Sequence, residues 1–175
     1  MRVETTNILV AGLGGQGVLK ASDILADALF RAGYDVKKSE LHGMSQRGGS
    51  VWSDVRFGSE VASPMIPEGE VDMLVAVSED QVAPHRGLLR EGARVITPKV
   101  LGGALPPNKR SVNIALLGFL SRRLPIPAEC WLAALGAAFS GDVLKANAVA
   151  FELGRDTTDT DVSESSSSIT IPRVS

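Results

Sequence analysis

Residues 7–18 read Asn-Ile-Leu-Val-Ala-Gly-Leu-Gly-Gly-Gln-Gly-Val, an apolar run that ends in a cluster of glycines. An uninterrupted apolar run of this length is typical of a buried parallel strand. From Val18 the spacing changes, because Val18, Ser22, Leu25 and Leu29 fall on one face of a helix. Gly33 then stands where a glycine commonly ends a helix. The stretch predicts a strand, a tight turn and a helix, the opening of a βαβ unit.

The segments that follow continue this pattern. Short apolar or alternating runs predict strands, and helical periodicity returns in the last third of the chain. The expected strands are 34–39, 51–57, 72–77 and 93–97, and the expected helices are 78–90, 111–123, 128–140 and 142–153. Gly154 is expected to end the last helix. We therefore predict an α/β fold, doubly wound, with a mostly parallel sheet and C-terminal helices.

The end of the chain has a different composition. From Arg155 onward the sequence is rich in Asp, Thr and Ser and has almost no large apolar residue before Ile169. Such a segment cannot bury enough apolar surface to offset its ordering entropy. We expect one domain over residues 1–154 and a tail, 155–175, that is disordered or docks onto a partner.

Composition excludes several functional classes. The chain has 175 residues and a net charge of −2, so it offers no strong field for nucleic acid or an anionic membrane. Its one cysteine, Cys130, can form neither an internal disulfide nor an iron–sulfur cluster, which usually needs four cysteines. The two histidines, His42 and His85, have no metal-ligand spacing, so no metal site is expected. A polar N-terminus and the lack of a membrane-length apolar run lead us to expect a cytoplasmic protein.

The glycines of the first turn have two interpretations. Gly12, Gly14 and Gly17 match the G-x-G-x-x-G pattern that binds dinucleotides at a helix N-terminus, and Glu40 is then a candidate for the ribose-binding acid. Alternatively, the turn is a tight crossover that needs positive φ and has no room for a Cβ atom. Both interpretations stay open at this point.

A second glycine-rich segment, residues 42–50, is polar and long enough to be functional. The glycines after Arg47 allow consecutive amides to form an anion-binding nest with a guanidinium beside it, although a flexible surface loop is the simpler interpretation. His42 could hydrogen-bond a substrate carboxylate or cap the loop. We expect both segments to lie at the same sheet edge and to converge on one ligand or partner. The candidate binding or interface residues are Gly12, Gly14, Gly15, Gln16, Gly17, His42, Gly43, Met44, Ser45, Gln46, Arg47, Gly48, Gly49 and Ser50; no catalytic residue is named on this chain.

The sequence also predicts the environment of several single residues. Asp54 and Arg56 are expected to form a solvated pair on one strand face. Cys130 falls in an apolar helix and is expected in the core. Trp131 could lie in the core or at an interface, whereas the charged neighbours of Trp52 favour an interface.

Several of these segments resemble one enzyme family. Residues 7–18 are similar to the start of the gamma-type domain of the 2-oxoacid:ferredoxin oxidoreductases. Residues 39–51 are closer still to the small (beta) subunits of the indolepyruvate branch of that family, and residues 63–67 and 147–154 resemble those subunits too. Family members often have Leu-Lys where this chain has Ala148-Val149, and the tail has no counterpart. The resemblance covers roughly residues 5 to 155.

The resemblance implies a small subunit that binds no cofactor alone. A large catalytic alpha subunit is then expected to hold thiamine diphosphate, Mg²⁺ and the [4Fe–4S] clusters, and ferredoxin is expected to act through the complex. The implied reaction converts an aryl 2-oxoacid, coenzyme A and oxidised ferredoxin to acyl-CoA, CO2 and reduced ferredoxin. Two alternatives remain: a stand-alone NAD(P)-binding oxidoreductase, or a non-enzymatic interaction domain.

Overall fold

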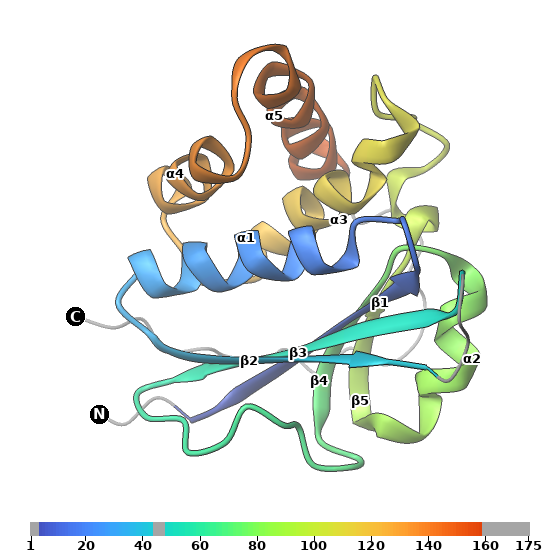
Figure 1. Ribbon diagram of the computed structural model, residues 1–175, viewed down its shortest axis with the longest axis vertical. Helices are drawn as coiled ribbons and strands as arrows, with labels where there is room; N and C mark the ends of the chain where they lie inside the picture. Colours follow the sequence, from blue (N-terminus) through green and yellow to red (C-terminus); the bar gives the residue numbers. More distant parts are fainter. Residues whose placement is uncertain (1–3, 44–47, 159–175) are drawn as a thin grey trace.

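The computed structural model describes residues 4–43 and 48–158. These residues form a five-stranded sheet with the strand order β2-β3-β1-β4-β5 (Figure 1). Short 3-10 helices cover Glu79–Gln81, Arg86–Leu88, Pro98–Leu101 and Lys109–Ser111. The strands are β1 (Thr6–Leu13), β2 (Asp35–His42), β3 (Ser50–Gly58), β4 (Val71–Ala76) and β5 (Leu89–Ile96), and the α-helices are α1 (Val18–Arg31), α2 (Val82–His85), α3 (Val112–Ser121), α4 (Ala128–Ala138) and α5 (Gly141–Asp156).

The sheet is mixed. Strands β1, β4 and β5 are parallel, whereas β3 lies between β2 and β1 and is antiparallel to both. The α/β class and the C-terminal helices are confirmed, but the expected mostly parallel sheet is wrong. A parallel return needs a crossover of about a dozen residues or more, and only residues 43–49 separate β2 from β3. Strand β3 therefore returns beside β2 as a hairpin.

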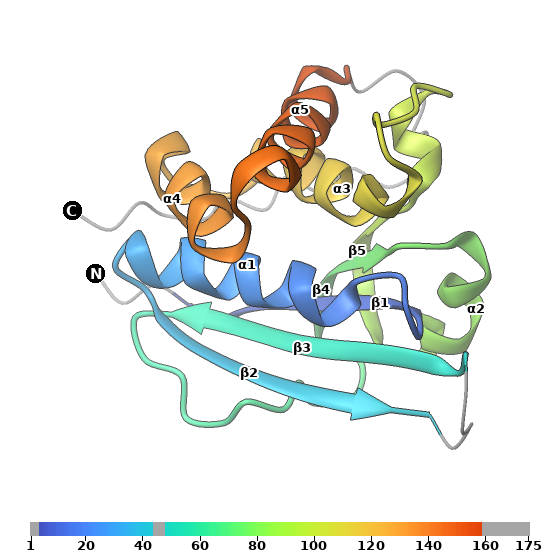
Figure 2. The same cartoon turned by 45° about the horizontal axis from the view of Figure 1, so that its top comes forward.

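The two faces of the sheet are covered differently. On one face, Ile8 and Val10 of β1 join a core built with α1, α3, α4 and α5 (Figure 2). On the other face, Leu9 and Ala11 join a smaller cluster that includes residues of α2 and of the 3-10 turn after it. Because all four long helices contribute to the first core, the doubly wound arrangement is not observed. Burial of β1 on both faces explains its uninterrupted apolar sequence.

The expected helix 78–90 is wrong. The chain forms a 3-10 turn, the one-turn helix α2 and a second 3-10 turn, and β5 already begins at Leu89. Pro84 lacks the amide that a longer helix would need there. Gly92 lies inside β5 with φ 74°, beside an irregularity in the pairing with β4. A glycine at such a position is typical of a β-bulge.

Helices α3 and α5 pack with their backbones in contact. A Cβ atom added at Gly154 would lie 1.8 Å from the carbonyl oxygen of Ala115, and one added at Gly118 would lie 1.9 Å from that of Phe151. Gly154 therefore does not end the helix as expected, because α5 continues to Asp156. Residues 159–175, most of the expected tail, lie outside the described residues. Among the helices that the structure describes, none is long and apolar enough to span a lipid bilayer.

The segment before β4 is held by two charged side chains of β3. Arg56 Nη1 donates to the carbonyl oxygens of Ser63 and Met65, each at 2.9 Å. Asp54 is only 5% exposed, and its Oδ2 accepts from the amide of Ile66 at 2.9 Å. The expected solvated Asp54–Arg56 pair is therefore wrong. Both side chains instead anchor residues 63–66.

The buried carboxylate predicts a pH-dependent stability. Desolvation raises the pKa of Asp54, so the folded state binds the proton more readily than the unfolded chain. Its contribution to stability is present at low pH and is lost as the pH rises through that pKa. The free energy of unfolding of Asp54→Asn, relative to wild type, should therefore increase as the pH rises from acid to neutral in chemical denaturation.

Asp35 provides a control of opposite sign. The backbone amide of Val61 lowers the pKa of Asp35, so its carboxylate stabilises the folded state above its unfolded pKa. Relative to wild type, Asp35→Asn should lose stability over the same rise in pH. Parallel pH profiles for the two variants would contradict the assignment.

Candidate functional site

The two glycine-rich segments lie side by side at one end of the sheet. In the antiparallel pairing of β1 with β3, Leu13 lies opposite Ser50. One residue beyond this pair, the amide of Gly14 donates to the carbonyl oxygen of Gly49 at 3.0 Å. The segments were expected to meet through parallel strand order, but they meet because β3 runs back against β1.

Close packing within the chain accounts for two glycines of the first turn. A Cβ atom at Gly12 would lie 2.6 Å from Cγ2 of Val18. Gly17 has φ 75°, and a Cβ atom there would lie 2.5 Å from Nδ2 of Asn113. At these positions the tight-crossover interpretation is sufficient, without any ligand.

The other residues of the turn have different roles. The Gln16 side chain closes the turn, because its Oε1 accepts from the amide of Leu13 at 2.7 Å. Gly15 has φ 88° and open space around its Cβ position, and no atom lies closer than 3.7 Å to a Cβ atom at Gly14. Gly14 and Gly15 are therefore available to a molecule from outside the chain.

A pocket of about 520 Å³ opens between the turn and the hairpin. Its size falls within the usual range of small-molecule sites. The described residues that line it come from the turn, the first turn of α1 and the two ends of the hairpin. They are Leu13, Gly14, Gly15, Gly17, Val18, Leu19, Lys20, His42, Gly43, Gly48, Gly49, Ser50 and Val51.

The pocket has the electrostatics of an anion site. Helix α1 begins after Gly17, which has no side chain that could cap the first amides. Those amides have no acceptor within the helix and carry the positive end of its dipole. Lys20 lines the pocket as well, with its Nζ 5.9 Å from the centroid of the Phe139 ring beside it, and no Asp or Glu is among the described lining residues. Phosphate and carboxylate groups are the ligands that such a lining favours.

The predicted site residues divide into three groups. Gly14, Gly15, Gly17, His42, Gly43, Gly48, Gly49 and Ser50 line the pocket, whereas Gly12 and Gln16 support the turn. Met44, Ser45, Gln46 and Arg47 lie outside the described residues. Lys20 and Asn113 were not predicted from the sequence. Lys20 could have been found from its position in the first helical turn, but nothing local marks Asn113, whose Nδ2 donates to the carbonyl oxygen of Gly17 across 96 residues of sequence.

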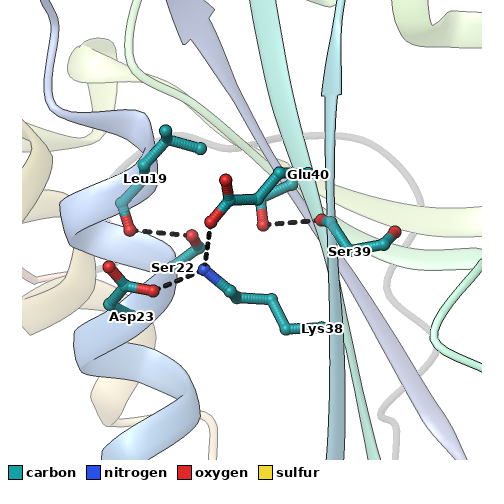
Figure 3. A network of polar contacts seen from close by, with 7 residues as sticks. Leu19, Ser22, Asp23, Lys38, Ser39 and Glu40 are labelled. Carbon is teal, nitrogen blue, oxygen red and sulfur yellow. Dashed lines mark hydrogen bonds and ion pairs between the residues drawn. The ribbon is translucent and has the colours of Figure 1, made fainter.

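Glu40 is occupied by an ion pair outside the pocket. Lys38 Nζ contacts Glu40 Oε1 at 2.6 Å and also pairs with Asp23 of α1 (Figure 3). This network connects the edge strand β2 to α1. Glu40 is not among the pocket-lining residues, so the geometry gives no support to its role as a ribose-binding acid.

Histidines and tryptophans lie in several environments. His85 is buried and packs edge-on against Trp52, with 5.2 Å between ring centroids, and Trp52 itself is half-buried. Trp131 is fully buried, which places it in the core, whereas Cys130, expected in the core, is only half-buried and packs against it. Within the described residues, no three His, Cys, Asp or Glu side chains gather as a metal site would require.

Comparison with known proteins identifies the family. The sequence pattern of the pyruvate ferredoxin/flavodoxin oxidoreductase family matches residues 7–106. The chain belongs to this family. It is 40% identical over 123 residues to the indolepyruvate oxidoreductase subunit IorB of Thermococcus kodakarensis, which is 70% of this chain and 59% of that subunit. The corresponding subunit of Pyrococcus horikoshii is 39% identical over 109 residues, 62% of this chain and 52% of the relative. The chain thus spans about half the length of these curated relatives.

Solved structures share the fold. The 2-oxoglutarate:ferredoxin oxidoreductase of Magnetococcus marinus, solved with 2-oxoglutarate, coenzyme A and succinyl-CoA bound, matches with a TM-score of 0.73 and 23% identity over 91% of this chain and 32% of that chain. The gamma subunit of a keto/oxoacid ferredoxin oxidoreductase from Geobacter sulfurreducens matches with a TM-score of 0.69 and 23% identity over 87% of this chain and 97% of that subunit. The mixed-sheet fold is therefore found both as a whole subunit and as about a third of a longer chain.

Proposed function

We propose that this chain is the small subunit of a 2-oxoacid:ferredoxin oxidoreductase that acts on indolepyruvate or a related aryl 2-oxoacid. The complex would convert the oxoacid, coenzyme A and oxidised ferredoxin to acyl-CoA, CO2 and reduced ferredoxin. Identity of about 40% to subunits of indolepyruvate oxidoreductases supports the substrate class. The pyruvate ferredoxin/flavodoxin oxidoreductase family pattern over residues 7–106 supports the reaction type.

The redox cofactors are assigned to a larger partner subunit. Thiamine diphosphate with Mg²⁺ and the [4Fe–4S] clusters would lie there, because a single cysteine cannot hold a cluster. The part of this chain that the structure describes contributes an anion pocket instead. Ferredoxin would act through the assembled complex, and the isolated chain would be inactive.

The pocket between the turn and the hairpin is proposed to hold a phosphate group of coenzyme A. The observation that carries this assignment is its lining, which combines the N-terminus of α1 with Lys20 and contains no described carboxylate. Coenzyme A carries several phosphate groups, and helix N-termini bind phosphate through exposed amides. His42 lines the same pocket and can donate a hydrogen bond to the ligand.

The NAD(P) alternative is less well supported. Gly12 and Gly17 are required by packing inside the chain, and Glu40 is paired with Lys38. Titration of the isolated chain with NADH, followed by nucleotide fluorescence, separates the two functions. Saturable binding would favour the stand-alone oxidoreductase over the proposed subunit.

Lys20→Gln is expected to weaken the use of coenzyme A. The Nζ atom of Lys20 would turn from the Phe139 ring toward the bound phosphate. Loss of this cation should raise the KM for coenzyme A about five- to tenfold, with kcat little changed, in the assembled complex. The KM of the variant should also depend less steeply on salt, because one screened charge pair is gone. Steady-state reduction of ferredoxin measures both parameters.

Lys37→Gln is the matched control. Lys37 is an exposed lysine on β2 that pairs with Asp35, and it does not line the pocket. Its substitution makes the same change in net charge and should leave the KM for coenzyme A unchanged. Equal effects of the two substitutions would show that overall charge, rather than the pocket, determines coenzyme A use.

A further inference from the structure

The turn that follows β4 contacts both glycine-rich segments. Ser78 Oγ lies 3.2 Å from Gln16 Oε1, which closes the first turn. Ser50 Oγ, at the start of β3, donates to Gln81 Oε1 at 2.6 Å. Residues 78–81 thus connect the two walls of the pocket at the sheet edge, although neither Ser78 nor Gln81 lines the pocket.

Gln81 is itself held firmly. It is 5% exposed, and its amide donates to the carbonyl oxygen of Ser78 at 3.1 Å. Its own carbonyl oxygen lies 2.8 Å from Nδ1 of the buried His85. The His85 ring packs edge-on against Trp52, which follows Ser50 by two residues on the same strand. Because its backbone is fixed on both sides and its side chain is buried, Gln81 can determine the position of Ser50, which donates to its Oε1.

The hairpin wall needs such a fixed point. Gly43, Gly48 and Gly49 border the pocket and have the conformational freedom of glycine. The other described bonds at this wall join backbone atoms: Gly14 donates to Gly49, and the amide of Gly43 donates to the carbonyl oxygen of Ser50 at 2.8 Å. If this wall had to become ordered when the ligand binds, the entropy lost in ordering it would weaken the affinity for the ligand.

We propose that Gln81 is a positioning residue of the pocket, which acts through Ser50 to hold the hairpin wall in the conformation that binds the ligand. This inference deepens the proposed function and rests on it for the identity of the ligand as coenzyme A. Gln81 touches no ligand; it keeps the Ser50 end of the hairpin in place. Residues of this kind control affinity without contributing a contact.

The test uses the assembled complex and two substitutions that break the same bond. Gln81→Met keeps the volume of the side chain and removes the acceptor, and Ser50→Ala removes the donor. Each should raise the KM for coenzyme A about five- to tenfold and leave kcat within about twofold. The double variant should be no worse than either single variant, and Ser50→Thr, which restores the hydroxyl, should recover the wild-type KM.

Ser53→Ala is the matched control from the same strand. Ser53 is fully buried and donates to the carbonyl oxygen of Ser39 at 2.9 Å, away from the pocket. Its loss removes a comparable serine hydrogen bond and should leave the KM unchanged. A KM that rises as much in Ser53→Ala as in Gln81→Met would overturn the proposal, because any loss of sheet stability would then suffice. A KM that rises in Ser50→Ala but not in Gln81→Met would overturn it too, because Ser50 would then act on the ligand without Gln81.

Hydrogen exchange tests the positioning role of Gln81 even if the proposed coenzyme A function is wrong. If the wild-type complex reduces ferredoxin equally well without coenzyme A, the proposed function fails and the KM test has no meaning. The amide of Gly14 still reports on the hairpin, because it is bonded to Gly49. Its exchange should be about five- to tenfold faster in Gln81→Met and Ser50→Ala than in wild type and Ser53→Ala. Equal exchange in all four proteins would contradict the positioning role, whatever the ligand.

Discussion

Gly154→Ala is expected to lower the free energy of unfolding by about 3 kcal/mol or more, or to leave no folded protein. Its Cβ atom would lie 1.8 Å from the carbonyl oxygen of Ala115, and Gly118 makes the reciprocal approach to Phe151. The obstructing atoms belong to backbone in both cases, so no side-chain rotation can relieve the overlap. Helices α3 and α5 would have to separate, and overpacking of this severity exceeds the usual cost of an added methylene in a core. Urea denaturation of the full chain measures the change in stability.

Gly136→Ala provides the control for this prediction. Gly136 lies within α4, its backbone does not require a positive φ, and its Cβ position has no neighbour within 4 Å. The same substitution should there raise stability by roughly 0.5–1 kcal/mol, because alanine favours a helix more than glycine does. If both variants unfolded at the same urea concentration, the backbone contact between α3 and α5 would not be important for stability.

Gly17→Ala is expected to lower both stability and coenzyme A use. Alanine is strained at φ 75°, and its Cβ atom would lie 2.5 Å from Nδ2 of Asn113. Asn113 would have to give up its hydrogen bond to the carbonyl oxygen of Gly17, and with it a direct link between α3 and the start of α1. We expect a loss of about 2–4 kcal/mol in the free energy of unfolding. The KM for coenzyme A should rise about tenfold or more, because the first amides of α1 would move.

Gly15→Ala separates the cost of the left-handed backbone conformation from the cost of the overlap with Asn113. Gly15 has φ 88°, but its Cβ position is open. Its substitution therefore carries only the cost of the left-handed conformation, roughly 1–2 kcal/mol. Thermal unfolding of both variants should show a clearly larger loss for Gly17→Ala. Equal losses would mean that Asn113 moves aside at no cost.

Local sequence patterns predict the elements better than their arrangement. The run from Asn7 to Ala11 is apolar throughout because both faces of β1 are buried, so its strand is evident from sequence. The predicted direction of β3 is wrong because a glycine-rich segment that could bind a ligand is also short enough to close a hairpin, and residues 43–49 are too few for a parallel crossover. The prediction for Gly154 is wrong because a glycine that ends a helix and one that permits close helix packing have the same appearance in a single sequence. Only Ala115 on the opposite helix distinguishes the two cases.

The sequence predicts the parts of the candidate site that are contiguous, but not the residues that support them from elsewhere in the chain. Both glycine-rich segments are visible in the sequence, since they are contiguous and unusual in composition. Their supports are single polar residues far away along the chain, such as Gln81, 31 residues from Ser50. Gln81 gives no local signal, because a glutamine in a turn is usually exposed. Its role depends on the pairing of β3 with β1, which brings Ser50 to the end of β4.

The most direct test is the activity of the complex isolated from its native cell through a tag on this chain. Reduction of ferredoxin would be followed with indolepyruvate, in the presence and absence of coenzyme A. We predict that ferredoxin is reduced only when both are supplied, with one acyl-CoA formed for each oxoacid consumed. A chain that is recovered alone and binds NADH saturably, or a complex whose rate does not depend on coenzyme A, would contradict the assignment of this subunit and its pocket.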